Sequence, residues 1–438
     1  MTYPYASNTY VGWDFVDTWQ EDPLYLNDGY PYLEWQTFEI YPEAEAPTAG
    51  DGTPSNPYEI SSLENLYWIA ASEDVVPDPD QATRWSSHYI QIADIDASST
   101  SGWFAGQGWT PIGDNSDISN ETRFTGTYDG QDYTINGLFI NRPDMDHVGL
   151  FGYASGSLLE NIGTIDFNIN GHYYVGGLVG MTESYTLISN CFSDGIVNGD
   201  YYVGGLVGAH TFHSTVSNSF SSCNVSGYSE VGGLSGRTAQ STHSNSYSIS
   251  SVGGNSYVGG FIGRDLGYCT IVNCYSKGSV NGISWVGGFI GHQFGTTFTN
   301  CYWDMETSGQ PSSAAGEGRT TEEMTYTYAA NTYVDWDFIN TWKADPQYLN
   351  DGYPYLHWQD SGIELLTPEN LITNIADGYI YLHWEAVENA NSYKVYACYD
   401  PYSEDWQLLD VVHEPIFSES ISGAMKFYRI VASTETME

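Results

Sequence analysis

Short apolar runs recur along the middle of the chain at a fixed interval, and a pair of glycines interrupts almost every run. The string YYVGGLVG occupies residues 173–180 and returns at 201–208. Six related strings end at Gly152, Gly180, Gly208, Gly236, Gly263 and Gly291. Successive copies are therefore separated by a nearly constant step of roughly 28 residues, and such regularity predicts a stack of similar structural units.

The apolar positions inside each string do not keep the two-residue period of a strand. Val175 and Leu178 are three residues apart, whereas one face of a strand recurs every two residues. Both can point inward only if the chain turns a corner at Gly176 and Gly177, where a Cβ would obstruct the bend. One such unit cannot bury a core, but stacked coils can. We therefore predict an all-β chain: a parallel β-solenoid with coils of about 28 residues and about three short strands per coil.

A polar column keeps the same step between the strings. Its members are Asn190, Asn218, Asn245, Asn273 and Asn300, and an aromatic residue follows each of them two positions later. In a solenoid the side-chain amides would bond to their neighbours one coil above and below, at a second corner. We expect this column to be a structural ladder.

An aromatic column precedes the valine of several strings. Its members are Tyr174, Tyr202, Tyr257 and Trp285, and Glu230 interrupts the row. Strand alternation makes these side chains face solvent. Flat rings at strand spacing can stack on glycans, and they can equally be cross-strand pairs that favour β structure. The column is the candidate glycan-stacking site.

The repeat resembles a known family. VGGLVG followed by SNCFSDG or VNCYSKG and then VNG is similar to the GLUG repeat of bacterial secreted and surface proteins, over about residues 58–358. Adhesin-like proteins carry this repeat, and so do some IgA-cleaving metallopeptidases outside their catalytic domain. The resemblance implies a right-handed parallel β-helix and an extracellular, cell-surface location, and it implies no catalytic residue.

A longer repeat marks the ends of the solenoid. Residues 1–36 match residues 324–359 at 27 of 36 positions. The solenoid is expected at 50–359, with an opening cap at 50–100, regular coils at 148–303 and a closing segment at 324–359. Ser61 and Glu64 have the spacing of a capping box, which predicts a short helix in the cap.

The first copy of the longer repeat lacks a solenoid to close. We expect residues 1–36 to be the closing segment of a preceding solenoid outside this sequence, followed by an acidic linker at 37–49. The aromatic residues of segment 1–36 should dock on the chain's own opening cap. This predicts a monomer with a minority of domain-swapped dimers.

The pattern changes after Asp360. Alternating strands with Trp384, Tyr393, Val395 and Tyr428 resemble a fibronectin type III module over residues 366–438. A small β-sandwich is therefore expected after the solenoid.

Charge excludes several classes of partner. The chain has 55 Asp and Glu against 11 Lys and Arg, for a net charge of −44. A phosphate backbone or an anionic membrane would be repelled, so we expect no nucleic acid partner. A membrane-spanning helix needs an apolar run of roughly 18 residues or more, and the chain has none, so no membrane insertion is expected. The six cysteines lack metal-ligand spacing, and buried thiols are favoured over a Cys274–Cys301 disulfide.

Candidate chemistry is sparse. Enzymes on β-helices need converging carboxylates, and within residues 148–303 only Asp166 and Asp194 share a column. His210 and His213 form HxxH without the HExxH of metallopeptidases, and we expect both on a surface turn. Asp28 and Asp351 beside glycine could offer oxygens to a structural Ca²⁺, with solvation as the alternative. No other cofactor is expected.

These observations predict a non-catalytic extracellular segment of a larger bacterial protein. It would serve as a spacer or an adhesin-like surface for a carbohydrate or a surface protein. The alternative is a polysaccharide lyase or glycoside hydrolase on a β-helix scaffold. Three carboxylates converging in one groove would favour that alternative.

Overall fold

The computed structural model describes residues 4, 9–11, 13–15, 19–20, 30–33, 42–114, 122–361, 371–376, 379–385, 392–398, 407–420 and 426–433. The chain forms two compact units, one of residues 1–324 and 328–336 and the other of residues 325–327 and 337–438. The boundary divides the predicted closing segment after Trp336. Within the described part of the chain, no helix is long and apolar enough to cross a membrane.

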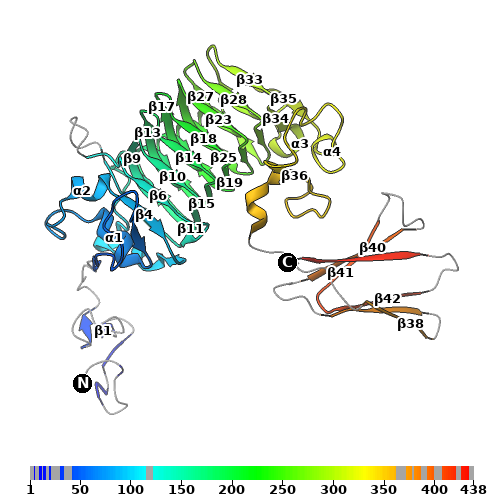
Figure 1. Ribbon diagram of the computed structural model, residues 1–438, viewed down its shortest axis with the longest axis horizontal. Helices are drawn as coiled ribbons and strands as arrows, with labels where there is room; N and C mark the ends of the chain where they lie inside the picture. The colour runs from blue at the N-terminus through cyan, green and yellow to red at the C-terminus, as the bar shows by residue number, and fades with distance from the viewer. Residues whose placement is uncertain are drawn as a thin grey trace. The chain divides into compact units, whose positions relative to one another are not determined.

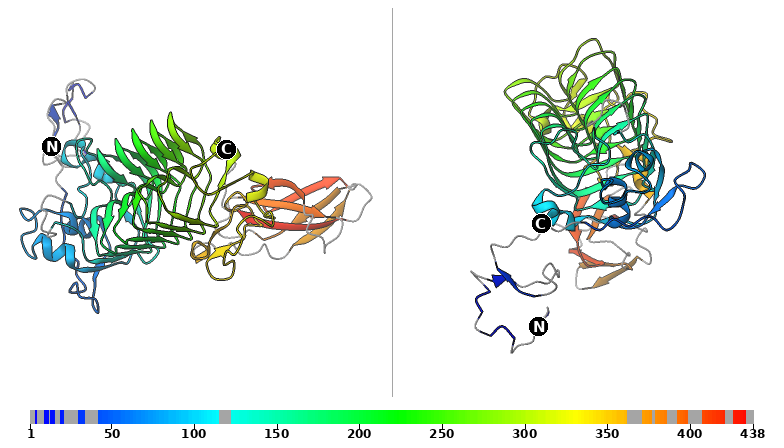
Figure 2. Two further views of the ribbon diagram at one scale, coloured as in Figure 1. Left: turned by 90° about the horizontal axis from the view of Figure 1, so that it is seen from above. Right: turned by 90° about the vertical axis from the view of Figure 1, so that its left-hand side faces the viewer.

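The first unit contains a parallel β-solenoid, which confirms the predicted fold class (Figures 1 and 2). A coil has four strands rather than the three expected, because the glycine pair divides each string into two strands. The coil that starts at Tyr173 illustrates this, with β12 (Tyr173–Gly176), β13 (Val179–Glu183), β14 (Leu187–Ser189) and β15 (Phe192–Asn198). Each strand pairs in parallel with its equivalent in the next coil.

The coils build four sheets, which we number in the order in which the chain visits them. Sheet 1 consists of β12, β16 (Tyr201–Gly204), β21 (Ser229–Gly232), β26 (Ser256–Gly259) and β31 (Ser284–Gly287). Sheet 2 consists of β9 (Phe151–Ser155), β13, β17 (Val207–Thr211), β22 (Ser235–Ala239), β27 (Ile262–Asp265) and β32 (Ile290–His292). Sheet 3 consists of β3 (Tyr58–Ile60), β4 (His88–Gln91), β6 (Thr127–Asp129), β10 (Leu158–Glu160), β14, β18 (Thr215–Ser217), β23 (Thr242–Ser244), β28 (Thr270–Val272) and β33 (Thr297–Thr299). Sheet 4 consists of β5 (Ile95–Asp96), β7 (Thr134–Asn136), β8 (Phe139–Asn141), β11 (Gly163–Asn170), β15, β19 (Phe220–Ser221), β20 (Asn224–Ser226), β24 (Tyr247–Ser248), β25 (Ser251–Gly253), β29 (Tyr275–Ser276), β30 (Val280–Asn281), β34 (Tyr302–Asp304) and β35 (Glu317–Arg319).

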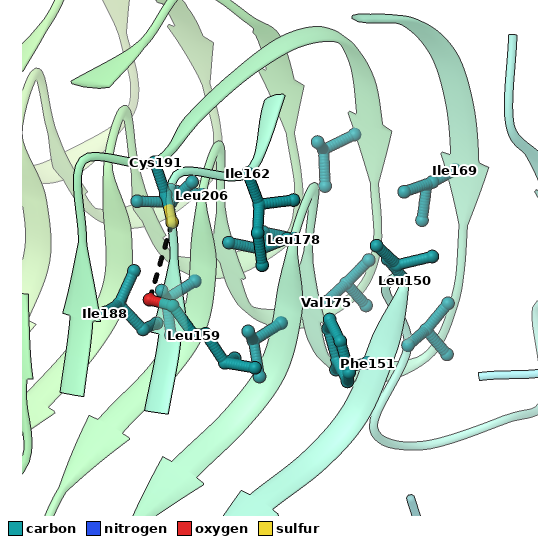
Figure 3. Close-up of a cluster of buried hydrophobic side chains, with 14 of the residues drawn as sticks. Leu150, Phe151, Leu159, Ile162, Ile169, Val175, Leu178, Ile188, Cys191 and Leu206 are labelled. Atoms are coloured by element: carbon teal, nitrogen blue, oxygen red, sulfur yellow. Dashed lines mark hydrogen bonds between the residues drawn. The ribbon is translucent and has the colours of Figure 1, made fainter. Parts of the chain in front are cut away.

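The core is a set of inward columns, one residue per coil. Val175 and Leu178 are both fully buried on either side of the glycine corner, as the spacing predicts. Their neighbours from sheets 2, 3 and 4 fill the rest of the interior (Figure 3). A Cβ on Gly177 would lie 2.4 Å from the carbonyl oxygen of Gly205 in the next coil, so only glycine fits between the stacked corners. The cysteine thiols are free and buried, and Cys191 Sγ contacts the Leu159 carbonyl at 3.6 Å.

Aromatic rings stack along the coils of sheet 4. The rings of Phe192, Phe220, Tyr247 and Tyr275 follow one another at 4.8 to 5.1 Å between centroids, with interplanar angles of 2 to 7°. This distance matches the spacing of hydrogen-bonded strands. Aromatic side chains at equivalent positions of successive coils therefore stack face to face.

Two helices, α1 (Leu63–Ala70) and α2 (Gln81–Ser86), cap the first coils. The N-cap of α1 is Ser62, which accepts a hydrogen bond from the Asn65 amide, so the predicted capping residue is off by one position. The buried Arg84 side chain donates to the Trp68 carbonyl and to the Ala71 carbonyl near the end of α1. A guanidinium there satisfies carbonyls that have no partner inside the helix. Two 3-10 helices follow, η1 (Ser98–Gly102) and η2 (Phe104–Gly106).

The other end of the solenoid is covered after the short helices α3 (Met305–Ser308) and α4 (Thr321–Met324). Trp336 Nε1 donates to the carbonyl of Asn300 at 3.1 Å, and the ring of Tyr333 packs edge-on against Tyr302. These contacts place an aromatic lid on the last coil.

The two copies of the longer repeat share one local structure. β1 (Trp19–Gln20) pairs antiparallel with β2 (Tyr32–Leu33), and β36 (Trp342–Lys343) pairs antiparallel with β37 (Tyr355–Leu356). Both ladders place a tryptophan opposite a leucine. The first copy therefore keeps the hairpin pairing of the second. Docking of residues 1–36 on the cap depends on residues that lie mostly outside the described part of the chain.

The second unit contains two antiparallel sheets of three strands each, which confirms the small sandwich. One sheet consists of β38 (Ile372–Ala376), β39 (Tyr379–His383) and β42 (Ile416–Ser420), and the other of β41 (Gln407–Val412), β40 (Ser392–Cys398) and β43 (Phe427–Ser433). The 3-10 helix η3 (His357–Ser361) precedes them. Trp384 is buried and packs against Tyr393 in the core. The resemblance to a fibronectin type III module stays a prediction.

Candidate binding surface

The candidate aromatic column lies within the strands of sheet 1, on a repeated backbone irregularity. The backbone of each member is left-handed, with φ of 58° at Tyr174, 59° at Tyr202, 55° at Tyr257 and 56° at Trp285. The strand pairing skips these positions, since Tyr173 pairs with Tyr201 and Val175 with Val203. A left-handed conformation is costly for a bulky residue, and such strain concentrates at functional sites.

Most rings of this column have a neighbour on one or both faces. His147 extends the column by one coil and stacks on Tyr174 at 4.8 Å with an angle of 4°. Tyr174 in turn lies 4.7 Å from Tyr202, whose other face is covered by the Arg237 guanidinium at 3.9 Å. Trp285 is the exposed member, with 58% of its surface accessible. Tyr174 and Tyr202 therefore present edges rather than faces, and glycan stacking on this column stays a prediction.

At the position of the aromatic column in its own coil, Glu230 places a buried carboxylate instead of a ring. Arg237 Nε and Nη2 donate to its two oxygens at 2.5 and 2.7 Å, and Arg264 Nη1 donates to Oε1 at 3.1 Å. Burial lowers the pKa of Arg237, but the hydrogen bond and charge of Glu230 outweigh this and raise it. Glu230 thus pairs with the guanidinium that stacks on Tyr202 and also with that of Arg264.

We expect Glu230→Gln to destabilise the solenoid by about 2 kcal/mol, because hydrogen bonds to charged groups are lost and Arg237 stays behind in a partly buried position. Urea unfolding followed by circular dichroism measures the loss. Asp74→Asn, at an exposed carboxylate of the opening cap, is the control and should stay within about 0.5 kcal/mol of wild type. Equal stability of the two variants would contradict a structural role for the Glu230 ion pairs.

A groove of about 330 Å³ runs along the outer face of sheet 2 beside this column. Its lining is Tyr174, Met181, Ala209, Thr211, Phe212, Arg237, Ala239, Gln240, Leu266, Gly267 and Tyr268. Met181, Ala209 and Arg237 follow one another in one outward column, because Met181 pairs with Ala209 and Ala209 with Arg237. Ala239 and the fully buried Ala209 are the small side chains of this lining.

The far wall of the groove carries exposed rings that the sequence reasoning missed. Phe212 and Tyr268 belong to the turns between sheets 2 and 3, and 52% and 80% of their surfaces are accessible. Both residues have positive φ, 48° and 60°. Their turns recur with the coil period, so an alignment of the turns rather than the strands would have found them.

The predicted asparagine ladder occupies another corner. All five members have φ between 47° and 54°, a conformation that asparagine tolerates better than most residues. Asn190 Nδ2 donates to Oδ1 of Asn161 at 3.0 Å, Asn273 to Asn245 at 3.3 Å, and Asn300 to Asn273 at 3.5 Å. Asn218 holds the same backbone position, since its amide donates to the Ser244 carbonyl at 3.1 Å.

The described residues bring few catalytic groups together. Asp166 bulges out of β11 next to Asp194, and burial, with a smaller contribution from Asp166, raises the pKa of Asp194. Within the described part of the chain, no three His, Cys, Asp or Glu side chains gather as a metal site. His213 lies on a turn, but the surface position predicted for His210 is wrong because this side chain is fully buried.

The predicted Ca²⁺ ligands are placed only in part. Asp28 lies outside the described residues. Asp351 lies in a loop whose backbone amides at Leu349, Asn350 and Gly352 donate to the carboxylate of Asp345 at 2.7 to 2.9 Å. The loop is therefore organised by a buried carboxylate, and Ca²⁺ binding stays a prediction.

Comparison with known families and curated proteins identifies relatives that match part of this chain. The GLUG motif matches residues 254–281, which confirms the resemblance for that repeat. Halomucin of Haloquadratum walsbyi is 40% identical over 141 residues, which cover 32% of this chain and 1% of that protein. A putative Gly-rich membrane protein of Evansella cellulosilytica is 33% identical over 153 residues, which cover 32% of this chain and 15% of that protein. The match thus covers a small part of either relative.

Among solved structures, an IgA1 protease has a TM-score of 0.42 and 19% identity to this chain. The similarity covers 56% of this chain and 19% of that protein.

Proposed function

We propose that this chain is a non-catalytic segment of a larger bacterial cell-surface protein, and that the outer face of its solenoid is adhesive. The chain would act outside the cell, as a monomer with a minor domain-swapped form, and its sandwich would be a fibronectin type III-like spacer. The ligand would be a carbohydrate or a glycosylated surface protein.

One observation carries the adhesive role. Aromatic residues at Tyr174, Tyr202, Tyr257 and Trp285 occupy left-handed backbone positions in four coils, where glycine or asparagine would cost less. Strain repeated in register is retained where the surrounding structure and a function require it. The names of the relatives, halomucin and a Gly-rich membrane protein, support a surface location.

The alternative is a polysaccharide lyase or glycoside hydrolase. Its support is the Asp166–Asp194 pair, in which one carboxyl has a raised pKa. A glycosidase needs two carboxyl groups flanking the scissile bond, one of them able to donate a proton. Asp194 pairs with Ile165, and Asp166 bulges out of β11 beside it, so both would lie on the same side of a bound chain. We therefore favour binding without cleavage.

The test measures binding and cleavage on the same samples. We expect the full-length chain to be retained on immobilised glycans or bacterial polysaccharide and to release no reducing ends or unsaturated products. Product release that is lost in Asp194→Asn would establish the enzyme instead. Absence of retention on every surface would reduce the role to that of a spacer.

A further inference from the structure

We infer that the groove on sheet 2 binds a neutral polysaccharide chain, with the exposed rings of Phe212 and Tyr268 stacking on its sugar rings. The inference rests on the proposed adhesive function and gives it a site and a ligand class. It moves the site from the column of Tyr174 to the opposite wall of the groove.

The two walls of the groove differ in whether the faces of their aromatic rings are covered. On one side the faces of Tyr174 and Tyr202 are covered by other rings and by Arg237. On the other side Phe212 and Tyr268 stack on no other ring within the described part of the chain, so their faces are available. Solvent-exposed rings beside a concave apolar surface mark a binding site rather than a core.

The floor of the groove on sheet 2 has small side chains that leave room for a ligand. Ala209 stands where the neighbouring coils carry Met181 and Arg237, and Ala239 stands next to Thr211 in a second column. The volume of about 330 Å³ lies at the lower end of the range for small-ligand sites. A short stretch of a chain ligand fits such a space better than a bulky globular partner.

Polar groups converge on the same space. The side-chain amide of Gln240 has no partner among the described residues and lies between the turns that carry Phe212 and Tyr268. Thr211 Oγ1 donates to the Thr182 carbonyl at 3.0 Å and can still accept a hydrogen bond from a ligand. Apolar faces with a few hydrogen-bonding groups suit a sugar, which has CH faces and a rim of hydroxyl groups.

The electrostatics select an uncharged ligand. Arg237 is the charged residue of the lining, and its Nε and Nη2 are both held by Glu230, a carboxylate that Arg264 shares. The chain carries a net charge of −44, which repels uronates and sialylated glycans. A cationic ligand would find no carboxylate in the lining. Neutral hexose polymers remain as the class that matches.

A buried carboxylate holds the turn that carries Tyr268. Asp265 is fully buried and accepts hydrogen bonds from the Gly267 amide at 3.0 Å, the Phe294 amide at 3.1 Å and the Thr296 hydroxyl at 2.6 Å. It thereby ties the turn of Tyr268 to the turn of the following coil. The wall is ordered before a ligand arrives, which lowers the entropy lost on binding.

The test is isothermal titration calorimetry of the full-length chain with oligosaccharides of glucose, mannose, galactose and N-acetylglucosamine, and with polygalacturonate and sialyllactose as anionic probes. We expect binding to at least one neutral series. We expect Tyr268→Ala and Phe212→Ala to weaken it roughly three- to tenfold each, the range measured for single aromatic contacts. Ala239→Leu, which fills the floor and removes no ring, should weaken it at least as much.

Tyr228→Ala is the matched control, because Tyr228 is an exposed tyrosine on a turn that does not line the groove. Its affinity should equal that of wild type. Neutral glycan binding that survives both Tyr268→Ala and Ala239→Leu would place the site elsewhere and leave the adhesive function standing. Preference for the anionic probes, or retention on surfaces without binding to any neutral series, would overturn the ligand class.

Discussion

Gly204→Ala is expected to destabilise the solenoid by about 4 kcal/mol or more, at the upper end of single-substitution effects. A Cβ at this corner would lie 2.0 Å from the Val207 carbonyl oxygen and 2.8 Å from backbone atoms of Gly236 and Leu234 in the next coil. These neighbours are backbone atoms, so no side chain can move aside. Since the corner recurs in every coil, displacement of one coil breaks the parallel pairing with the next.

Gly253→Ala is the control for this substitution. Gly253 ends β25 in the same solenoid, and a Cβ there would meet nothing within 4 Å. The two variants therefore introduce the same methyl group, one at a closed corner and one in open space. Thermal and urea unfolding measured by circular dichroism compare them. A stability of Gly204→Ala within about 1 kcal/mol of Gly253→Ala would contradict the close-approach explanation.

Acid is expected to destabilise the solenoid through two histidines in its core. His210 and His243 are fully buried with ring centroids 5.0 Å apart. Burial lowers the pKa of His210 from 6.5 to about 4, and burial together with the nearby His210 lowers that of His243. Both are neutral in the folded chain. As the pH falls, they bind protons in the unfolded chain before they do so in the folded chain. The free energy of unfolding is therefore unaffected by these histidines above pH 6.5. It decreases as the pH falls toward 4, by about 3 kcal/mol for His210 alone.

The double variant His210→Thr with His243→Val tests this prediction. Thr182 and Thr238 stand on either side of His210 in its column, and Val216 precedes His243 in its own, so both replacements suit their positions. Urea midpoints at pH 7.5, 6 and 4.5 should fall much less in the variant than in wild type. Titration of the many surface carboxylates is common to both proteins. If the urea midpoint falls equally with pH in both, these histidines do not control the acid sensitivity.

The periodic features of the fold could be predicted from the sequence. The constant step between the glycine strings implies stacked coils. The three-residue spacing of Val175 and Leu178 implies a glycine corner, because strand periodicity admits no other way to bury both side chains. The solenoid followed by a small sandwich is confirmed. The count of about three strands per coil was wrong, because the two sides of the predicted glycine corner pair as separate strands in two different sheets.

The candidate site was predictable only in part. The sequence places Tyr174 and Tyr202 in one column, but it does not say what covers their faces. That depends on Arg237, which sheet 2 brings alongside them at the corner. The burial of His210 depends likewise on which side of β17 faces the core, and strand pairing that skips a residue reverses simple alternation.

By itself the sequence determined which residues share a column, because a fixed repeat length makes every coil place equivalent residues in register. The tertiary structure decided how neighbouring columns meet: that Glu230 pairs with both Arg237 and Arg264, that Ala239 lines the groove together with Tyr174 and Tyr268, and that rings on the turns keep free faces. The physical reason is that contacts along a column follow from the period, whereas contacts between columns follow from the angle of each corner. That angle is set by backbone conformation and packing, which no spacing encodes.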